Sequence, residues 1–191
     1  MKISMLAMIR HPASQAQDAP ILLIAHGLYG SGRNWGVIAR RLADRREVVA
    51  VDMRNHGESP RFPSQGYPEM AEDLAKVIED LGAPVDLLGH SMGGKTAMQL
   101  ALTRPDLIRR LIVADIAPVP YQHDQTRNAQ AMASLDLSRI KSRAEADAAL
   151  ALKIDDPALR AFFLQSLDLR QHPPRWKLNL AVLEAEMPKI V

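Results

Sequence analysis

Short apolar runs recur along the chain, separated by segments whose apolar residues have helical spacing. Four of the runs are of strand length and mainly aliphatic, and the run at residues 21–25 is typical of a strand buried on both faces of a parallel sheet. They cover residues 21–25, 47–51, 85–88 and 111–114. An earlier run, residues 1–9, indicates a first strand, because Arg10 and His11 interrupt it too soon for a signal-peptide core or a membrane span.

The segments between the runs predict helices. Residues 67–81 carry one apolar stripe, consisting of Met70, Leu74, Val77, Ile78 and Leu81, and Gly82 and Pro84 follow it as helix-ending residues. A second helix is predicted over residues 92–103, before Pro105. A third stripe, with arginines on the opposite face, consists of Trp35, Ile38 and Leu42. Strands and helices in this alternation predict an α/β fold with a mostly parallel sheet, right-handed crossovers and helices on both faces.

The pattern changes after Pro118 and Pro120, where the sequence predicts helices with no strand between them. These helices lie around residues 129–135, 143–153 and 157–167. We therefore expect two parts: residues 1–118, the N-terminal part of an α/β core, and residues 119–191, a helical cap or lid set against the sheet. The pattern alone does not separate a lid from further helices of the same domain.

Composition and charge exclude some classes of function. The 24 basic and 22 acidic residues are scattered and leave a formal net charge of +2, so no basic groove for nucleic acid is indicated. Three Phe, three Tyr and two Trp provide few stacking platforms for bases. The chain has no cysteine, which excludes disulfides and thiolate metal sites and suits a cytoplasmic protein.

The strongest chemical signal is the sequence Gly89-His90-Ser91-Met92-Gly93. It matches the G-x-S-x-G pattern, and it lies between a predicted buried strand and a predicted helix, which is the context that the pattern requires. A serine on such a sharp turn projects from the sheet edge at a helix N-terminus, where free N–H groups and the helix dipole favour negative charge. The pattern therefore predicts Ser91 as a catalytic nucleophile.

A second glycine-containing loop follows the strand at residues 21–25. It reads His26-Gly27-Leu28-Tyr29-Gly30, and it ends at the same sheet edge as the serine turn. An oxyanion hole at a nucleophile elbow needs one N–H from the residue after the serine and one from an upstream loop. We therefore expect the backbone N–H groups of Met92 and Leu28 to fill these roles. A third polar segment, residues 52–59, we interpret as structural, with Asp52 and Arg54 able to pair.

These motifs together resemble a known family. HGLYGSGRNW, VDMRNHGES, LLGHSMGG and VADIAP, within residues 20–120, are similar to the α/β-hydrolase superfamily, and more narrowly to the YbfF-like esterases. The resemblance implies an α/β-hydrolase fold and a triad of serine, histidine and acid that cleaves short acyl esters and acyl thioesters. It carries the nucleophile to Ser91, the oxyanion donors to Leu28 and Met92, and the acid to Asp115, directly after the run at residues 111–114.

The resemblance leaves the histidine of the triad unassigned. In the family it follows the acid on a loop after the last strand, and two further strands would come after those seen here. His123 and His172 follow Asp115 in the sequence, but both belong to the helical part and are better explained as surface residues. We therefore expect the histidine beyond Val191, in a missing C-terminal segment or a second polypeptide that completes the sheet and its core.

The function expected from these residues is that of a serine hydrolase acting on a small-molecule ester through an acyl-serine intermediate, with no metal or cofactor. A serine nucleophile argues against the dehalogenases and epoxide hydrolases of this fold, which use aspartate. Two alternatives stay open: a cofactor-free perhydrolase, and a non-catalytic ligand-binding protein on a hydrolase scaffold.

Overall fold

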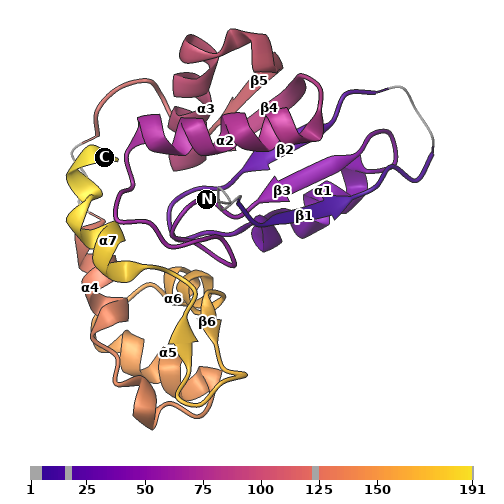
Figure 1. Ribbon diagram of the computed structural model, residues 1–191. Helices are drawn as coiled ribbons and strands as arrows, with labels where there is room; N and C mark the ends of the chain where they lie inside the picture. Colours follow the sequence, from indigo (N-terminus) through magenta and orange to yellow (C-terminus); the bar gives the residue numbers. More distant parts are fainter. Residues whose placement is uncertain (1–5, 16–18, 122–124, 191) are drawn as a thin grey trace.

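A five-stranded sheet forms the core of the N-terminal lobe, with the strand order β1-β3-β2-β4-β5 (Figure 1). The computed structural model describes residues 6–15, 19–121 and 125–190. Strand β1 runs antiparallel to β3, and the other neighbouring pairs are parallel. The strands are β1 (Met8–His11), β2 (Leu22–Ala25), β3 (Val48–Val51), β4 (Val85–His90) and β5 (Ile108–Ala114). All four aliphatic runs predicted as strands are therefore strands. The last of them, β5, begins at Ile108, earlier than its apolar run at residues 111–114.

Alternate residues of each strand point to opposite faces of the sheet, so the two faces bury different sets of side chains. Leu23, Val49 and Leu87 pack with helices α2 (Tyr67–Leu81) and α3 (Met92–Thr103). Leu22, Ile24 and Ala50 pack with Ala39 of helix α1 (Gly36–Leu42) and with Ala43 just after it. Two helices thus cover one face of the sheet and a single short helix covers the other. Helices on both faces are what the alternation of strands and helices in the sequence predicts. The predicted bounds of α2 and α3 are confirmed.

The apolar stripe predicted for α1 does not face the sheet. Ile38 is 46% exposed and Leu42 is 41% exposed, whereas Ala39 and Ala43 are buried. The small alanine side chains let the helix backbone approach β2 and β3 closely, so the larger apolar residues are rotated away from the contact. Helical spacing identified the element correctly, but residue size decided which face packs.

A C-terminal lobe follows the sheet and lies at one side of it (Figure 1). Its helices are α4 (Thr126–Ala133), α5 (Arg143–Ala151), α6 (Pro157–Leu164) and α7 (Leu180–Ala185). The prediction of helices alone is incomplete, because β6 (Leu167–Asp168) pairs antiparallel with β7 (Arg175–Trp176). Four 3₁₀ turns complete the described elements: η1 (Gly32–Trp35), η2 (Pro105–Leu107), η3 (Leu137–Arg139) and η4 (Met187–Lys189).

Side chains from both lobes form specific contacts across the junction between them. The ring of Tyr29 meets the ring of Phe163 edge-on, with centroids 5.4 Å apart. Asn179 N–H donates to the carbonyl oxygen of Asn55 at 2.9 Å. Aromatic packing and backbone hydrogen bonds of this kind fix the C-terminal lobe against the loops at the carboxyl ends of the strands rather than against a face of the sheet.

Arg54 does not pair with Asp52, contrary to the sequence-based expectation. Its Nε instead donates to Asp73 Oδ2 of helix α2 at 2.6 Å, and both side chains are largely buried, 8% and 9% exposed. Asp52 accepts the N–H groups of Gly32 at 2.7 Å and of Glu58 at 2.8 Å. The aspartate therefore organises its own turn, while the arginine connects this turn to α2.

We predict that Asp73→Asn destabilises the chain strongly, because it leaves the buried guanidinium of Arg54 without its counter-charge. The expected loss is about 3–5 kcal/mol in the free energy of unfolding, measured by urea denaturation. Glu72→Gln, on the exposed side of the same helix, is the matched control and is expected to cost less than about 1 kcal/mol. Equal losses in the two variants would contradict the importance of the buried pair.

Candidate active site

Ser91 occupies the sharp turn between β4 and α3. Its backbone has φ 51° and ψ −118°, a conformation that side-chain-bearing residues rarely adopt. The turn is held by hydrogen bonds on both sides: Ser91 N–H donates to Ala114 O at 3.0 Å, and Ser91 O accepts from Lys95 N–H at 3.1 Å. The serine is thus the N-cap residue of α3 and lies at the carboxyl end of a central strand.

The glycines of the motif permit a backbone approach that no other residue would allow. A Cβ atom on Gly89 would lie 2.3 Å from Gly93 O, and one on Gly93 would lie 2.4 Å from Ala25 O. Both distances are far shorter than a van der Waals contact between a carbon and an oxygen atom. The start of α3 is therefore pressed against the ends of β2 and β4, which is the reason for small residues two positions either side of the serine.

The loop at residues 26–30 lies beside this turn and presents a free backbone donor. Within the described part of the chain, neither Leu28 N–H nor Met92 N–H donates a hydrogen bond, whereas the N–H of Tyr29, the residue after Leu28, donates to His56 Nε2. Leu28 and Met92 both line the same cavity as Ser91. The two donors expected for an oxyanion hole are thus brought to one cavity, while their role in catalysis stays a prediction.

Two buried histidines fix the position of that loop. His26 Nδ1 donates to Gly27 O at 2.8 Å, and its Nε2 accepts Met53 N–H at 2.9 Å. His56 Nδ1 donates to Arg54 O at 2.7 Å, and its Nε2 accepts Tyr29 N–H at 3.2 Å. Each ring therefore needs one protonated and one bare nitrogen, which requires the neutral form.

Burial keeps both rings neutral. Desolvation lowers the pKa of His26 to about 4 and that of His56 to about 3. A neighbouring imidazole acts in the same direction on each ring: His90 lowers the pKa of His26, and His26, whose ring centroid is 5.1 Å away, lowers that of His56. In the sequence these two histidines belong to the motifs at residues 26–30 and 52–59, with no predicted role of their own. Their tertiary role is to connect the loop at residues 26–30 to the turn at residues 53–56.

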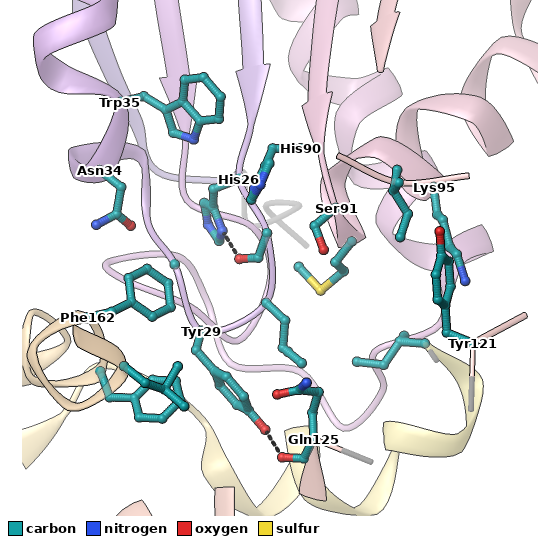
Figure 2. A pocket seen from close by; sticks show the side chains of 18 of the residues that line it. His26, Tyr29, Asn34, Trp35, His90, Ser91, Lys95, Tyr121, Gln125 and Phe162 are labelled. Atoms are coloured by element: carbon teal, nitrogen blue, oxygen red, sulfur yellow. Dashed lines mark hydrogen bonds between the residues drawn. The ribbon is translucent and has the colours of Figure 1, made fainter. Parts of the chain in front are cut away.

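A cavity of about 420 Å³ opens over Ser91, between the sheet edge and the C-terminal lobe (Figure 2). The sheet side contributes the loop at residues 26–30, the serine turn and Ile116, and the C-terminal lobe contributes Leu159, Phe162 and Phe163. A cavity of this size at the carboxyl ends of parallel strands is the usual place for a ligand in an open α/β sheet.

Asp115 directly follows β5, as the sequence predicts, and has a positive φ of 56°. Its carboxylate is 88% exposed, and the ion-pair contact described for it is with His90 Nε2 at 3.7 Å. His90 also meets the Trp35 ring edge-on, with centroids 5.9 Å apart. Asp115 is thus placed at the edge of the site with its carboxylate accessible, and its role as the triad acid stays a prediction.

No histidine of the described residues hydrogen-bonds to the Ser91 hydroxyl. His172 is exposed in the turn between β6 and β7 and does not line the cavity, so the structure does not bring it to the serine. His123 lies outside the described residues.

The described residues contain no cluster of three or more His, Asp or Glu side chains able to hold a metal ion. Among those same residues, no helix has both the length and the apolar character needed to cross a bilayer.

The chain belongs to the α/β hydrolase fold family, whose model matches residues 20–187. This assignment agrees with the mostly parallel sheet, the serine turn and the position of the cavity. It also confirms the fold expected from the sequence.

Two relatives and one solved structure are similar to this chain over most of its length. The chain is 39% identical over 182 residues to the sn-1-specific diacylglycerol lipase ABHD11 of Mus musculus, covering 90% of this chain and 59% of that protein. It is 37% identical over 184 residues to the esterase YbfF of Escherichia coli strain K12, covering 93% of this chain and 69% of that protein. Among solved structures, a marine microorganism esterase superposes with a TM-score of 0.90 at 38% identity, covering 98% of this chain and 74% of that chain. The chain thus spans about three-fifths of the mouse lipase.

The close packing at Gly93 leads to a stability prediction. Gly93→Ala places a methyl group against the backbone of β2, and we expect a loss of about 1–3 kcal/mol in the free energy of unfolding. Gly36→Ala is the matched control, because its nearest neighbour would be the end of the flexible Arg40 side chain at 3.4 Å. That variant is expected to be neutral or slightly stabilising. Chemical denaturation distinguishes them, and a neutral Gly93→Ala would refute the packing argument.

The neutral histidine pair leads to a prediction about pH. Both pKa values are lowered by folding, so the unfolded chain binds more protons as the pH falls below about 6.5. We expect the free energy of unfolding to be constant well above that pH and to decrease as the pH falls from about 6.5 toward about 4, by up to about 1.4 kcal/mol per pH unit for each histidine. Urea denaturation across this range measures it, and His172→Gln should leave the slope unchanged. A flat profile in the parent chain would contradict the neutral pair.

Proposed function

We propose that this protein is a serine hydrolase that cleaves carboxylic esters of small acyl groups, with Ser91 as nucleophile. The observation that carries the proposal is the strained Ser91 turn at the N-terminus of α3, which opens into a 420 Å³ cavity beside two uncommitted N–H groups. The names of the relatives, an esterase and a diacylglycerol lipase, support ester cleavage as the type of reaction.

In the proposed reaction the Ser91 hydroxyl oxygen attacks the ester carbonyl carbon, and the N–H groups of Leu28 and Met92 donate to the oxygen that becomes negative. The alcohol then leaves with the proton taken from the serine, and water hydrolyses the acyl-serine. Thioesters would follow the same steps with a thiol as leaving group. Asp115 would orient the histidine that transfers the proton.

We further propose that this histidine belongs to additional polypeptide, of this protein or of a partner, that pairs with the free edge of β5. Two observations support it. In the described sheet β5 pairs only with β4, and its apolar residues Leu111 and Ile112 are 38% and 47% exposed. The relatives are also longer than this chain, which covers 59% of the mouse lipase. A paired strand would cover the exposed backbone and side chains of this edge.

A second candidate function is ligand binding without turnover. It is favoured by the finding that, in the described residues, no histidine hydrogen-bonds to the Ser91 hydroxyl. Such a protein would keep the cavity and the oxyanion loop but would not form an acyl-serine.

Labelling with a fluorophosphonate, followed by intact-mass measurement, tests the nucleophile. We expect one adduct per chain, lost in Ser91→Ala and retained in Ser138→Ala, an exposed serine on η3. Asp115→Asn is expected to slow labelling at least tenfold if the acid orients a base. An adduct that persists in Ser91→Ala would contradict the proposal, and binding of a short-chain ester with no adduct would favour the binding function.

A further inference from the structure

The cavity over Ser91 has two chemically different ends. Figure 2 shows Trp35 and Phe162 toward one side of Ser91, and Lys95 with Tyr121 toward the other. The first end is lined mainly by aromatic and aliphatic side chains, together with Asn34, and no described Lys, Arg, Asp or Glu lines it. The second end contributes the Lys95 ammonium, which projects from α3 one turn after the serine.

Helix geometry fixes the spacing between the serine and this lysine. Ser91 caps α3 and Lys95 lies four residues later, so the two Cα atoms are separated by about 6 Å along the helix axis. Both residues line the cavity. A ligand whose reacting carbonyl lies at Ser91 would therefore present atoms a few bonds away to the Lys95 ammonium.

The ammonium is surrounded by aromatic rings rather than by acids. Lys95 Nζ lies 4.9 Å from the centroid of the Tyr121 ring and 5.8 Å from that of Tyr67. Ring faces attract a cation but do not neutralise its charge. No carboxylate of the described residues lies within ion-pair distance of Lys95, and no described Asp or Glu lines the cavity.

Asp115 is an acid at this edge of the site, and its described contact is with His90 rather than with Lys95. Partial burial also lowers the pKa of Lys95, which is the effect expected of an ammonium that has lost water without gaining a counter-ion. Lys177, which also lies at the junction of the lobes, by contrast pairs with the carboxylate of Glu58. Among the described residues, Lys95 is thus a cation on the cavity wall without an acidic partner.

We propose that Lys95, with Tyr67 and Tyr121, forms a subsite for a carboxylate carried by the substrate, so that the preferred ester has a negative charge a few bonds from its scissile carbonyl. The proposal rests on the proposed function, because it takes the cavity over Ser91 as the substrate site. A lysine suits this role because its ammonium has three donors that can follow a small carboxylate, and the desolvated site strengthens the attraction.

Equilibrium binding to the Ser91→Ala chain tests the subsite without requiring turnover. Monomethyl glutarate carries one carboxylate, and dimethyl glutarate is its neutral counterpart of nearly the same shape. Titrations followed by NMR chemical shifts give the ratio of the two dissociation constants. We expect the monoanion to bind at least tenfold more tightly, the range of a charge-assisted hydrogen bond.

Three variants in the Ser91→Ala background isolate the charge. Lys95→Met keeps the aliphatic stem and is expected to abolish the preference for the monoanion, whereas Lys95→Arg is expected to retain most of it. Lys76→Met removes an exposed lysine of α2 that pairs with Glu72, and it should leave the preference unchanged. Thermal unfolding of each variant shows whether the fold is intact.

Equal binding of the two esters to the Ser91→Ala chain, or a preference that persists in Lys95→Met, would overturn the subsite. Failure of the proposed function is recognised separately, as the absence of a Ser91 adduct with the fluorophosphonate. A Lys95-dependent preference without an adduct would therefore support the anion subsite on a binding protein.

Discussion

The close approach of three backbone segments at the Ser91 turn is the constraint on which the site depends. Strand β4 must reverse into α3 within one residue, while the first turn of α3 lies against the end of β2. Glycine at positions 89 and 93 removes the two Cβ atoms that would prevent this, and the positive φ of Ser91 is the local cost of the reversal. Packing on both sides of the turn stabilises it and keeps the serine and the helix N-terminus directed into one cavity.

The second requirement is that the loop at residues 26–30 keep its shape, although it has few backbone hydrogen bonds of its own. Two neutral imidazoles supply the missing connections, each using one nitrogen as donor and the other as acceptor. Full burial maintains this state, because a charged ring would lose solvation and also lose an acceptor. The position of Leu28 N–H thus depends on His26, which lines the cavity, and on His56, which does not.

The C-terminal lobe determines the shape of the cavity and the sheet side determines its chemistry. Phe162 and Phe163 close the cavity from the C-terminal lobe, whereas Ser91, the loop at residues 26–30 and Lys95 all come from the segments that follow strands. This division matches the family to which the chain belongs, in which the reactive groups follow the carboxyl ends of parallel strands. Differences in ligand preference would then arise from the lobe and from single charged residues such as Lys95.

The sequence by itself determined the elements and the reactive turn, because these depend on local signals. Uninterrupted aliphatic runs predicted the strands, a stripe of helical spacing predicted α2 over residues 67–81, and the spacing of glycines around Ser91 predicted the sharp turn. Only the tertiary structure decided the long-range pairings. Arg54 pairs with Asp73 rather than with Asp52, α1 packs through Ala39 rather than Ile38, and the buried histidines join two loops. Local periodicity predicts the secondary structure of one segment. These contacts depend instead on the shape and charge of segments that are distant in the sequence and become neighbours only after folding.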